Sequence, residues 1–419
     1  MGRDGCVRVL HLIVGLSGGG SERWLRDVVA LSSGDLDHRV VTVIPDGGED
    51  PVYAEELQAL AAYQPPRVAA PAKAALRGVR RHWPGQSSKL RALARGAGTL
   101  AALVRVVSAV RRSRPDVIHS HTIPDFPVAL AASRLFRIPL VHTVPCLFSQ
   151  LTEAGHSWMP RLYAACHPYV ACFSTGEGWR ELEALHVPRR KILYDLGGVD
   201  FGEVDAALAR RQSHAAHVRM RLGLPAGCPI ALSVGRLHES KGHMLALESL
   251  PALLERVPDL HWVVLGEGDQ RLALEERIAQ LGVQDHAHLV GYRRDPLVFY
   301  AAADLYLRSA LLEAENFSFY EAMATGLPAV GFATGVSRDL LLSVGNGAQV
   351  PLGEAREFAD AAARVLQLPD RGRSLGALGA AYARQNLDVR TSVARLAAVY
   401  LALAGGQTFE TSPAPLSGR

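Results

Sequence analysis

Residues 230–242 read IALSVGRLHESKG. The run Ile230–Val234 has the length and composition of a buried strand, Gly235 ends it, and the cations Arg236 and Lys241 follow. In an open α/β sheet, ligands bind beyond the carboxyl ends of the strands, which is where Gly235 is expected. An Arg fork and a Lys charge there suit a diphosphate leaving group, whose developing charge they stabilise without a metal. The alternative is an Arg and a Lys on a solvated turn.

Short β-branched runs alternate with longer helical patterns on both sides of this stretch, which is typical of βαβ units and a parallel sheet. An earlier series has expected strands at 7–14, 40–44, 117–119, 140–143 and 169–173. A later series has them at 230–234, 262–265, 287–289, 305–307 and 329–331. Because 419 residues exceed what one core usually fills, we expect an α/β protein with two Rossmann-like, doubly wound parallel-sheet domains.

The domain junction is expected in the polar, Arg-rich helical segment that follows Gly197–Asp200. We expect an N-terminal domain over residues 1–205 and a C-terminal domain over 206–390. A helix at 391–404 is expected to pack back on the N-terminal domain, and 405–419 to form a flexible tail because it lacks periodic apolar residues.

Composition narrows the class of protein. A formal net charge of +4 is too small to indicate a nucleic-acid partner. The longest apolar stretches break well short of the roughly 20 residues that a spanning helix needs. The 5 cysteines fit neither a disulfide framework nor a zinc pattern, and free buried thiols in a reducing cytoplasm explain them. We therefore expect a cytoplasmic protein.

A second group of polar residues occupies 313–324, EAENFSFYEAMA, which is expected to be a loop turning into a helix. Asn316 or Ser318 can cap that helix, whose free N–H groups and positive dipole end favour a phosphate. Carboxylates accept pairs of sugar hydroxyls, so Glu313 is a candidate for holding a transferred sugar and Glu321 for holding a ribose. The alternative is that these are ordinary acids at a helix start.

These motifs resemble those of the retaining glycosyltransferase family 4. The resemblance comprises the Arg/Lys pair, the Glu-x7-Glu spacing and the Glu-Ala-Met-Ala-x-Gly-x-Pro that begins at Glu321. It extends over 228–365, where Gly266 lies in the family's Gly-x-Gly turn and Tyr292 where the base is usually received. One departure is that Ala314, Glu315 and Asn316 follow the first glutamate, where the family commonly has Gly and an aromatic residue.

The resemblance implies the GT-B fold, in which two domains face a central cleft, with the acceptor on the N-terminal and the nucleotide sugar on the C-terminal domain. It implies transfer of a sugar from a nucleoside-diphosphate sugar to a hydroxyl acceptor with retention, with no cofactor and no metal. The implied catalytic residues are His121, Arg236, Lys241 and Glu313. The implied donor-binding residues are Gly19, Gly20, Gly235, Gly266, Tyr292, Asn316, Phe317, Ser318 and Glu321.

The N-terminal half matches this family more loosely, through GGGSER at 18–23 and PDVIHSH at 115–121. By the resemblance, Gly19 and Gly20 let the chain approach the phosphates, and His121 contacts a hydroxyl of the reacting sugar. His119 is then a core residue. Taken alone, a Gly run is also explained by any tight strand-to-helix turn.

Residues 67–114 contain 12 Arg or Lys and no Asp or Glu. One hypothesis is a basic surface that makes peripheral contact with anionic lipid on the inner membrane face, or with an anionic acceptor. The alternative is a solvated helix pair in an Arg-rich protein. Asp35-Leu36-Asp37 offers a superficial Asp-x-Asp metal motif, which we interpret as solvated turn acids.

Three other functions compete with sugar transfer. Nucleotide-sugar epimerases share the two-domain architecture, but the Glu-x7-Glu spacing and the Arg/Lys pair favour transfer. A dehydrogenase is disfavoured because no Gly-x-Gly-x-x-Gly follows the first strand. The departures at Glu315 and Asn316 leave a non-catalytic scaffold open. Natural-product, lipid and cell-surface glycan acceptors fit the residues equally well.

Overall fold

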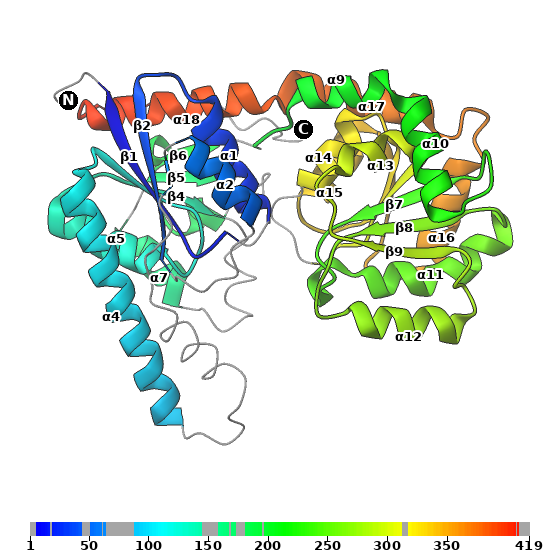
Figure 1. Ribbon diagram of the computed structural model, residues 1–419, viewed down its shortest axis with the longest axis horizontal. Helices are drawn as coiled ribbons and strands as arrows, with labels where there is room; N and C mark the ends of the chain where they lie inside the picture. Colours follow the sequence, from blue (N-terminus) through cyan, green and yellow to red (C-terminus); the bar gives the residue numbers. More distant parts are fainter. Residues whose placement is uncertain are drawn as a thin grey trace. The chain divides into compact units, whose positions relative to one another are not determined.

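The computed structural model describes residues 6–16, 19–43, 51–60, 62–63, 88–144, 158–166, 169–172, 181–194, 197–311, 317–407 and 409. The chain forms two compact units (Figure 1). Unit 1 comprises residues 1–173, 179–195 and 390–413, and unit 2 comprises 174–178, 196–389 and 414–419.

Unit 1 is a six-stranded parallel sheet of order β2-β1-β3-β4-β5-β6. Its strands are β1 (Val7–Ile13), β2 (Leu36–Thr42), β3 (Val117–Ser120), β4 (Leu140–Val144), β5 (Tyr169–Cys172) and β6 (Ile192–Tyr194). Its helices include α1 (Gly20–Leu31), α2 (Pro51–Ala59), α4 (Ser88–Ser113), α5 (Phe126–Phe136), α7 (Trp158–Cys166), the 3-10 turn η1 (Arg189–Lys191) and α18 (Val389–Ala404). Because successive side chains of a strand point to opposite faces, Leu10 and Leu12 pack under α4, α5 and α7, whereas His11 points to the other face.

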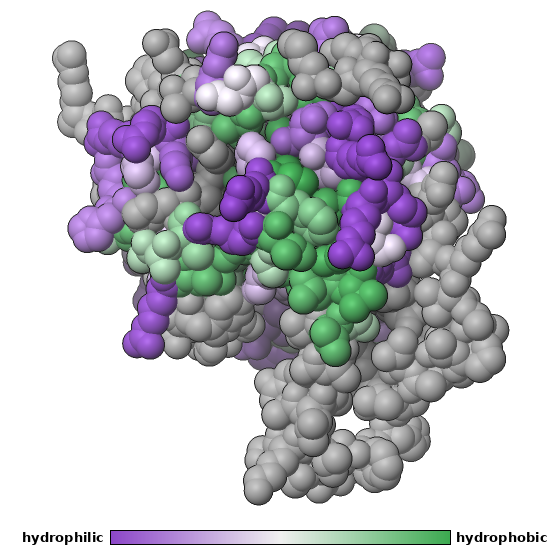
Figure 2. Space-filling model, turned by 90° about the vertical axis from the view of Figure 1, so that its left-hand side faces the viewer, coloured by the Kyte–Doolittle hydropathy of each residue, from purple (hydrophilic) through white to green (hydrophobic). Residues whose placement is uncertain are grey.

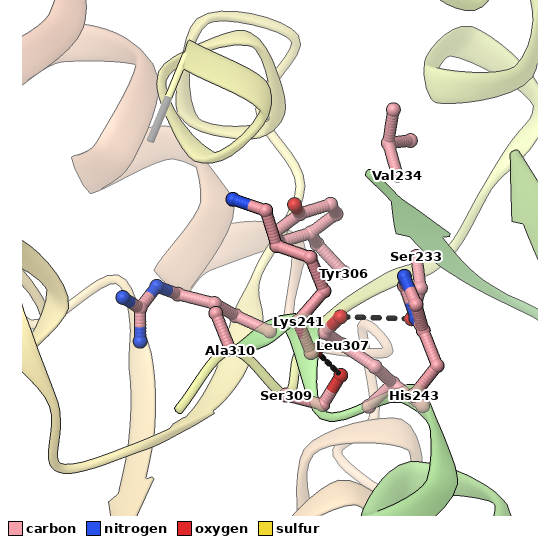
Figure 3. A pocket seen from close by; sticks show the side chains of 9 residues that line it. Ser233, Val234, Lys241, His243, Tyr306, Leu307, Ser309 and Ala310 are labelled. Carbon is pink, nitrogen blue, oxygen red and sulfur yellow. Dashed lines mark hydrogen bonds between the residues drawn. The ribbon is translucent and has the colours of Figure 1, made fainter. Parts of the chain in front are cut away.

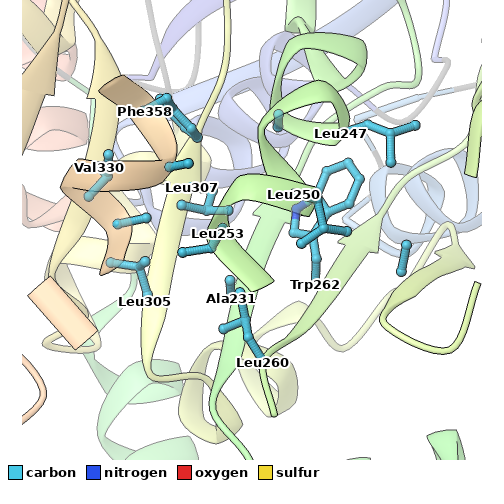
Figure 4. Packing of buried hydrophobic residues seen from close by; sticks show 14 of the residues in the cluster. Ala231, Leu247, Leu250, Leu253, Leu260, Trp262, Leu305, Leu307, Val330 and Phe358 are labelled. Atoms are coloured by element: carbon cyan, nitrogen blue, oxygen red, sulfur yellow. The ribbon is translucent and has the colours of Figure 1, made fainter. Parts of the chain in front are cut away.

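Unit 2 is a second six-stranded parallel sheet, of order β12-β11-β10-β7-β8-β9. Its strands are β7 (Ile230–Val234), β8 (His261–Leu265), β9 (Ala287–Gly291), β10 (Leu305–Arg308), β11 (Ala329–Phe332) and β12 (Gly347–Val350). Its helices include α9 (Phe201–Ala209), α10 (Arg211–Leu222), η2 (Glu239–Lys241), α11 (His243–Arg256), α12 (Arg271–Leu281), α13 (Pro296–Ala302), α14 (Phe317–Ala324), α15 (Gly335–Val344), α16 (Ala355–Leu366) and α17 (Arg373–Asn386). Trp262, Leu250 and Phe358 fill the core between the sheet and α11, α12 and α16 (Figure 4).

The expected α/β fold with two parallel sheets is confirmed. Two short edge strands were not predicted, β6 at Ile192–Tyr194 and β12 at Gly347–Val350. β12 opens on Gly347, where a Cβ atom would lie 1.8 Å from the Ala329 carbonyl oxygen, so close backbone approach replaces the β-branched pattern. The boundary between the units lies at 195/196, whereas the sequence placed it at 205/206.

Candidate active site

The second sheet reverses its winding direction between two neighbouring strands. From β7 the chain winds outward through β8 and β9, and from β10 it winds the other way through β11 and β12. Loops that leave such a pair of strands diverge and open a crevice at their carboxyl ends, where open α/β sheets bind ligands. In unit 2 the residues at that place are 235–242 after β7 and 309–311 after β10.

The loop after β7 is fastened to the end of β10. Ser309 Oγ donates to the Lys241 carbonyl oxygen at 2.8 Å, and the Leu311 N–H donates to that of Ser240 at 2.9 Å. Between them Gly242 has φ +61°, and a Cβ atom there would lie 2.1 Å from the Ser309 carbonyl oxygen. The backbone that carries Lys241 is therefore held against β10 by contacts that only glycine permits.

A small pocket opens at this junction (Figure 3). It is lined by Ser233, Val234, Lys241, His243, Tyr306, Leu307, Arg308, Ser309 and Ala310. Lys241 is half-buried, whereas Arg236 is exposed. Within the described part of the chain, Arg236 makes no ion pair or side-chain hydrogen bond. Two cations thus flank the reversal point, and the guanidinium of Arg236 pairs with no anion of the described residues.

The predicted glycines Gly235 and Gly266 bring the loops after β7 and β8 together. Gly266 has φ +148°, and a Cβ atom there would lie 1.9 Å from the Gly235 carbonyl oxygen. The Gly266 N–H donates to Gly291 at 2.9 Å, which joins the end of β9 to the same layer. Tyr292 follows, with 47% of its surface exposed. The glycines thus leave backbone without side chains at the ends of these strands, and the Tyr292 ring follows directly after Gly291.

The helix α14 begins at Phe317, so Ser318 lies within its first turn rather than ahead of it. Ser318 Oγ accepts a hydrogen bond from the Tyr306 hydroxyl at 3.0 Å, and its carbonyl oxygen accepts one from the Tyr300 hydroxyl at 2.8 Å. Two tyrosines therefore fix the start of α14. Glu321, one turn later, is 3% exposed.

Three further predicted residues belong to the same segment. Phe317 is half-buried, with its ring edge to face against Tyr320 at 6.0 Å between centroids. Glu313 and Asn316 lie outside the described residues. Their roles stay predictions.

Unit 1 has its own reversal point, between β1 and β3. Gly19 precedes α1 there, and its N–H donates to Glu22 Oε2 at 3.0 Å. A Cβ atom at Gly19 would lie 2.7 Å from that oxygen. The Glu22 carboxylate thus occupies the backbone N–H of Gly19, a glycine predicted to let the chain approach the phosphates, while Gly20 is exposed. A phosphate at this helix end would have to displace Glu22.

His121 belongs to a cluster of buried histidines at this reversal point. Its Nε2 lies 2.9 Å from His11 Nδ1, and His11 Nε2 lies 2.8 Å from His38 Nδ1. His119 shares the same face because it precedes His121 by two residues, and their ring centroids are 3.9 Å apart. Tyr400 of α18 bonds to His119 Nδ1 at 2.5 Å. None of the His121 side chain is exposed.

Burial dominates the electrostatics of this cluster. Desolvation, with a smaller contribution from repulsion by His38, lowers the pKa of His121 to about 3. Desolvation also lowers the pKa of His38 to about 4, against the pull of Asp37. The pKa values of His11 and His119 lie well below the ordinary value, first through desolvation and then through repulsion by neighbouring histidines. These imidazoles are therefore neutral at pH 7.

The opposite face of β3 fixes the loop that carries His121. Ser120 Oγ donates to Asp125 Oδ1 at 2.8 Å and lies 2.8 Å from His142 Nδ1. Asp125 also accepts from the backbone N–H groups of His121 and Thr122 at 3.4 and 3.1 Å. Burial raises the pKa of Asp125 to about 7, although these hydrogen bonds oppose the shift. The position of His121 is thus set from both faces of the sheet.

Two places have the residues of a metal site. Ring nitrogens of His11, His119 and His121 lie within 4.8 Å of one another. Both nitrogens of His11 and of His119 already share hydrogen bonds with neighbouring side chains. Asp37 of the Asp-x-Asp motif lies within β2, near its amino end, and pairs with Arg39 at 3.4 Å. Since ligands bind at the carboxyl ends of strands, the motif lies at the wrong edge of the sheet.

The basic stretch 67–114 is described in part. The helix α4 covers its second half, and Leu100 and Val104, one turn apart, are 63% and 61% exposed. Figure 2 shows unit 1 from this side, with apolar surface bordered by hydrophilic residues. Arg105 donates to Thr42 Oγ1 at 3.3 Å. None of the described helices is both long and apolar enough to cross a membrane.

Sequence reasoning missed His11 and His38. His11 and Arg8 interrupt the apolar strand β1, and His38 lies in β2 between Asp37 and Arg39. A polar side chain at a strand position of buried parity is the signal that was available for His11. Its partner, however, lies 110 residues away along the chain, so only the strand order identifies the contact.

Known proteins share both halves of this arrangement. The glycosyl transferases group 1 family matches residues 217–380, and the glycosyl transferase 4-like domain matches 18–194. The chain is 28% identical to the 2-deoxystreptamine N-acetyl-D-glucosaminyltransferase of Streptomyces fradiae, over 65% of this chain and 68% of that protein. It is 22% identical to the UDP-Gal:alpha-D-GlcNAc-diphosphoundecaprenol alpha-1,3-galactosyltransferase of Escherichia coli, over 64% and 70%.

Solved structures repeat the fold along the chain. Anabaena Alr3699/HepE in complex with UDP and glucose has a TM-score of 0.74 at 18% identity, covering 94% of this chain and 99% of that one. WaaG, a glycosyltransferase involved in lipopolysaccharide biosynthesis, has a TM-score of 0.67 at 16% identity, covering 94% and 99%. With two family matches on two parallel-sheet units, the chain belongs to the glycosyl transferases group 1, family 4, and is a retaining, nucleotide-sugar-dependent glycosyltransferase.

Proposed function

We propose that the chain transfers a hexose from a nucleoside-diphosphate sugar to a hydroxyl acceptor, with the diphosphate held by Arg236 and Lys241. The observation that carries this assignment is the fastening of the Lys241 loop to the end of β10 at the reversal point of the second sheet. A cation on a loop held in this way stabilises charge as the diphosphate leaves, with little reorganisation during the reaction.

The other predicted residues complete the scheme. Glu313 holds the transferred sugar and Glu321 the ribose diol, while Tyr292 lies beside the base. His121 contacts a hydroxyl of the reacting sugar. The leaving phosphate itself helps to deprotonate the acceptor, so a dedicated base is not required. Gly19 and Gly20 stay a predicted phosphate contact, with Glu22 as the group to be displaced.

The acceptor belongs to one of two chemical classes. Two curated relatives act on 2-deoxystreptamine, and another names a diphosphoundecaprenol acceptor. The exposed apolar pair Leu100 and Val104, on a helix inside the basic stretch, favours contact with anionic lipid. Flotation with vesicles containing phosphatidylglycerol tests this contact. Salt-sensitive binding supports a lipid-linked acceptor at the inner membrane face, and no binding supports a small dissolved acceptor.

Thermal unfolding against UDP, GDP and dTDP species tests the donor assignment, because a ligand that binds the folded state raises the midpoint. We expect a selective shift with one nucleotide, and its loss in Arg236→Ala. No shift with any of them would point to a non-catalytic scaffold. A shift without turnover in the presence of donor and acceptor would do the same.

A further inference from the structure

Three imidazoles form a row across three neighbouring strands of unit 1. The sheet order β2-β1-β3 places His38, His11 and His121 side by side, and ring nitrogens join them at 2.8 and 2.9 Å. The two outer nitrogens, His38 Nε2 and His121 Nδ1, are buried and have no hydrogen-bond partner among the described residues. The row therefore has a bonded centre and two open ends.

The number of protons limits how this row can be arranged. A neutral imidazole carries one N–H group and one acceptor nitrogen, and each bond between two rings needs one proton. Only two arrangements make both bonds: every ring is Nδ1–H, or every ring is Nε2–H. The tautomer of His121 is therefore tied, through His11, to that of His38.

Protonated rings would allow other hydrogen-bond arrangements, but the three rings are neutral near pH 7. Desolvation holds the pKa values of His38 and His121 at about 4 and about 3, and that of His11 well below the ordinary value. His119, Tyr400 and Thr143, on the same face of the sheet, are uncharged. Among the described residues, the charged group that acts on the row is Asp37, and its pull on His38 is smaller than the desolvation. The row stays a chain of neutral rings.

We propose that His11 is a positioning residue for the transfer reaction, holding His121 in a single tautomer through its two ring-to-ring hydrogen bonds. The neutral histidine side chain intrinsically prefers Nε2–H, and the all-Nε2–H arrangement satisfies this preference in each ring. The lone pair of His121 is then on Nδ1, which is the atom that would accept a hydrogen bond from a sugar hydroxyl. Because Nδ1 is buried, the sugar reaches it only after a local rearrangement. This inference rests on the proposed function, which places His121 beside the reacting sugar.

An ion bound by His11, His119 and His121 is the competing explanation of the cluster. A metal takes the lone pair of each ligand nitrogen, whereas both nitrogens of His11 and of His119 are already engaged in hydrogen bonds of 2.5–2.9 Å. Of these three rings, His121 is the one that has a nitrogen without a hydrogen-bond partner among the described residues. The observed hydrogen bonds thus favour a row of rings with a fixed order of protons over a metal site. The test of the proposal therefore includes a measurement of bound metal.

Long-range ¹H–¹⁵N spectra of the full chain, labelled on histidine, measure the tautomer directly and do not depend on turnover. We expect His121, assigned by the signal lost in His121→Asn, to be neutral and wholly Nε2–H at pH 7. A mixture of tautomers, or Nδ1–H, overturns the proposal. So does a stoichiometric transition metal whose removal by chelator shifts the signals of His11, His119 and His121.

Three variants separate positioning from packing. His11→Leu removes both bonds, His38→Phe removes only the outer one, and His11→Asn returns an amide near Nδ1 that bonds to His121 in either tautomer. We expect mixed His121 tautomers in all three. Turnover should fall by roughly 10-fold to 100-fold in His11→Leu, the range seen when partners that orient metal-binding histidines are removed, and less in the other two.

The variants also carry a control for the proposed function. Nucleoside diphosphates should still raise the unfolding midpoint of every folded variant, because Arg236 and Lys241 are untouched. Unchanged tautomers and turnover in His11→Leu overturn the positioning role while the donor site stands. If no nucleotide raises the unfolding midpoint of the unmodified chain, the donor site is overturned. The tautomer of His121 in the unmodified chain still tests the row of histidines.

Discussion

Each unit has polar side chains at the reversal point of its sheet, but the two sets of side chains differ in charge and in burial. At the reversal point of unit 2 the polar groups are cations, one half-buried and one exposed. At that of unit 1 they are imidazoles with 0–7% of their surface exposed, neutral because water is excluded. Exposed charge is ready for an anion at low desolvation cost, whereas a buried neutral cluster needs internal partners for its own polar groups. The first depends on a local loop and the second on four strands and a distant helix.

The comparison predicts that acid destabilises unit 1 first. A histidine whose folded pKa is lowered keeps its full contribution to stability above pH 6.5 and loses it as the pH falls toward the folded pKa, about 3 for His121 and His142. Each such buried histidine costs about 1 kcal/mol for the first pH unit below 6.5, and about 1.4 kcal/mol for the next. Asp125, with its pKa raised to about 7, has the opposite sign and offsets one of them.

Hydrogen exchange read by mass spectrometry at pH 7.0 and pH 5.5, corrected for intrinsic rates, measures both units in one experiment. We expect peptides of β1, β3 and β4 to lose protection before those of β7, β8 and β10. Equal losses of protection in both sheets would show that unit 1 is no more sensitive to acid than unit 2.

Arg236→Ala and Lys241→Ala should each reduce turnover by about 10²–10³-fold if the cations stabilise the leaving diphosphate. The unfolding midpoint without ligand should change little in Arg236→Ala, since the side chain is exposed and bonds to no described residue. The matched control is Arg256→Ala, which removes an exposed cation paired with Asp360 at 2.9 Å. Full turnover in both site variants would show that the two cations do not stabilise the leaving diphosphate.

Gly266→Ala should destabilise unit 2 by about 2–4 kcal/mol, because the new methyl group meets the Gly235 carbonyl oxygen at a backbone angle that L-residues avoid. Gly282→Ala is the control, with φ +66° and nothing within 4 Å of the added atom. It should cost about 1 kcal/mol from backbone strain alone. Urea unfolding gives both values, and equal losses would show that the loops do not need this close approach.

Tyr400→Phe should cost about 1–2 kcal/mol, since it leaves His119 Nδ1 buried without its partner. Tyr382→Phe in unit 2 removes a buried hydroxyl that has no hydrogen-bond partner among the described residues, so it should be neutral or stabilising. The difference between the two free energies of unfolding isolates the hydrogen bond. Identical values would mean that α18 contributes packing only.

Local sequence patterns predicted most of unit 2, although they missed its edge strand β12. Strand β7 was predicted at its observed bounds, and the cations five positions apart follow it on one loop, because the spacing and the strand end lie within a dozen residues. The contact of Lys241 with Ser309 could not be predicted, since it depends on β10 being the neighbour of β7.

Unit 1 was predicted only in outline. His121 was identified by resemblance, but its bonds join residues from β1, β2 and β3, and the hydroxyl that completes the cluster comes from Tyr400. Which buried polar group pairs with which is decided by strand order and parity. No single stretch of sequence contains the strand order, and none shows which strands pair through these side chains.

Helix α18 has a consequence for the order in which this protein is made. Residues 390–413 belong to unit 1, although all of 196–389 is translated before them. On the ribosome, unit 2 has its full set of strands and helices before the first sheet receives its last helix. During that interval His119 waits for Tyr400. A nascent chain arrested before residue 400 should therefore present a finished C-terminal sheet beside an N-terminal one that is still open to chaperones.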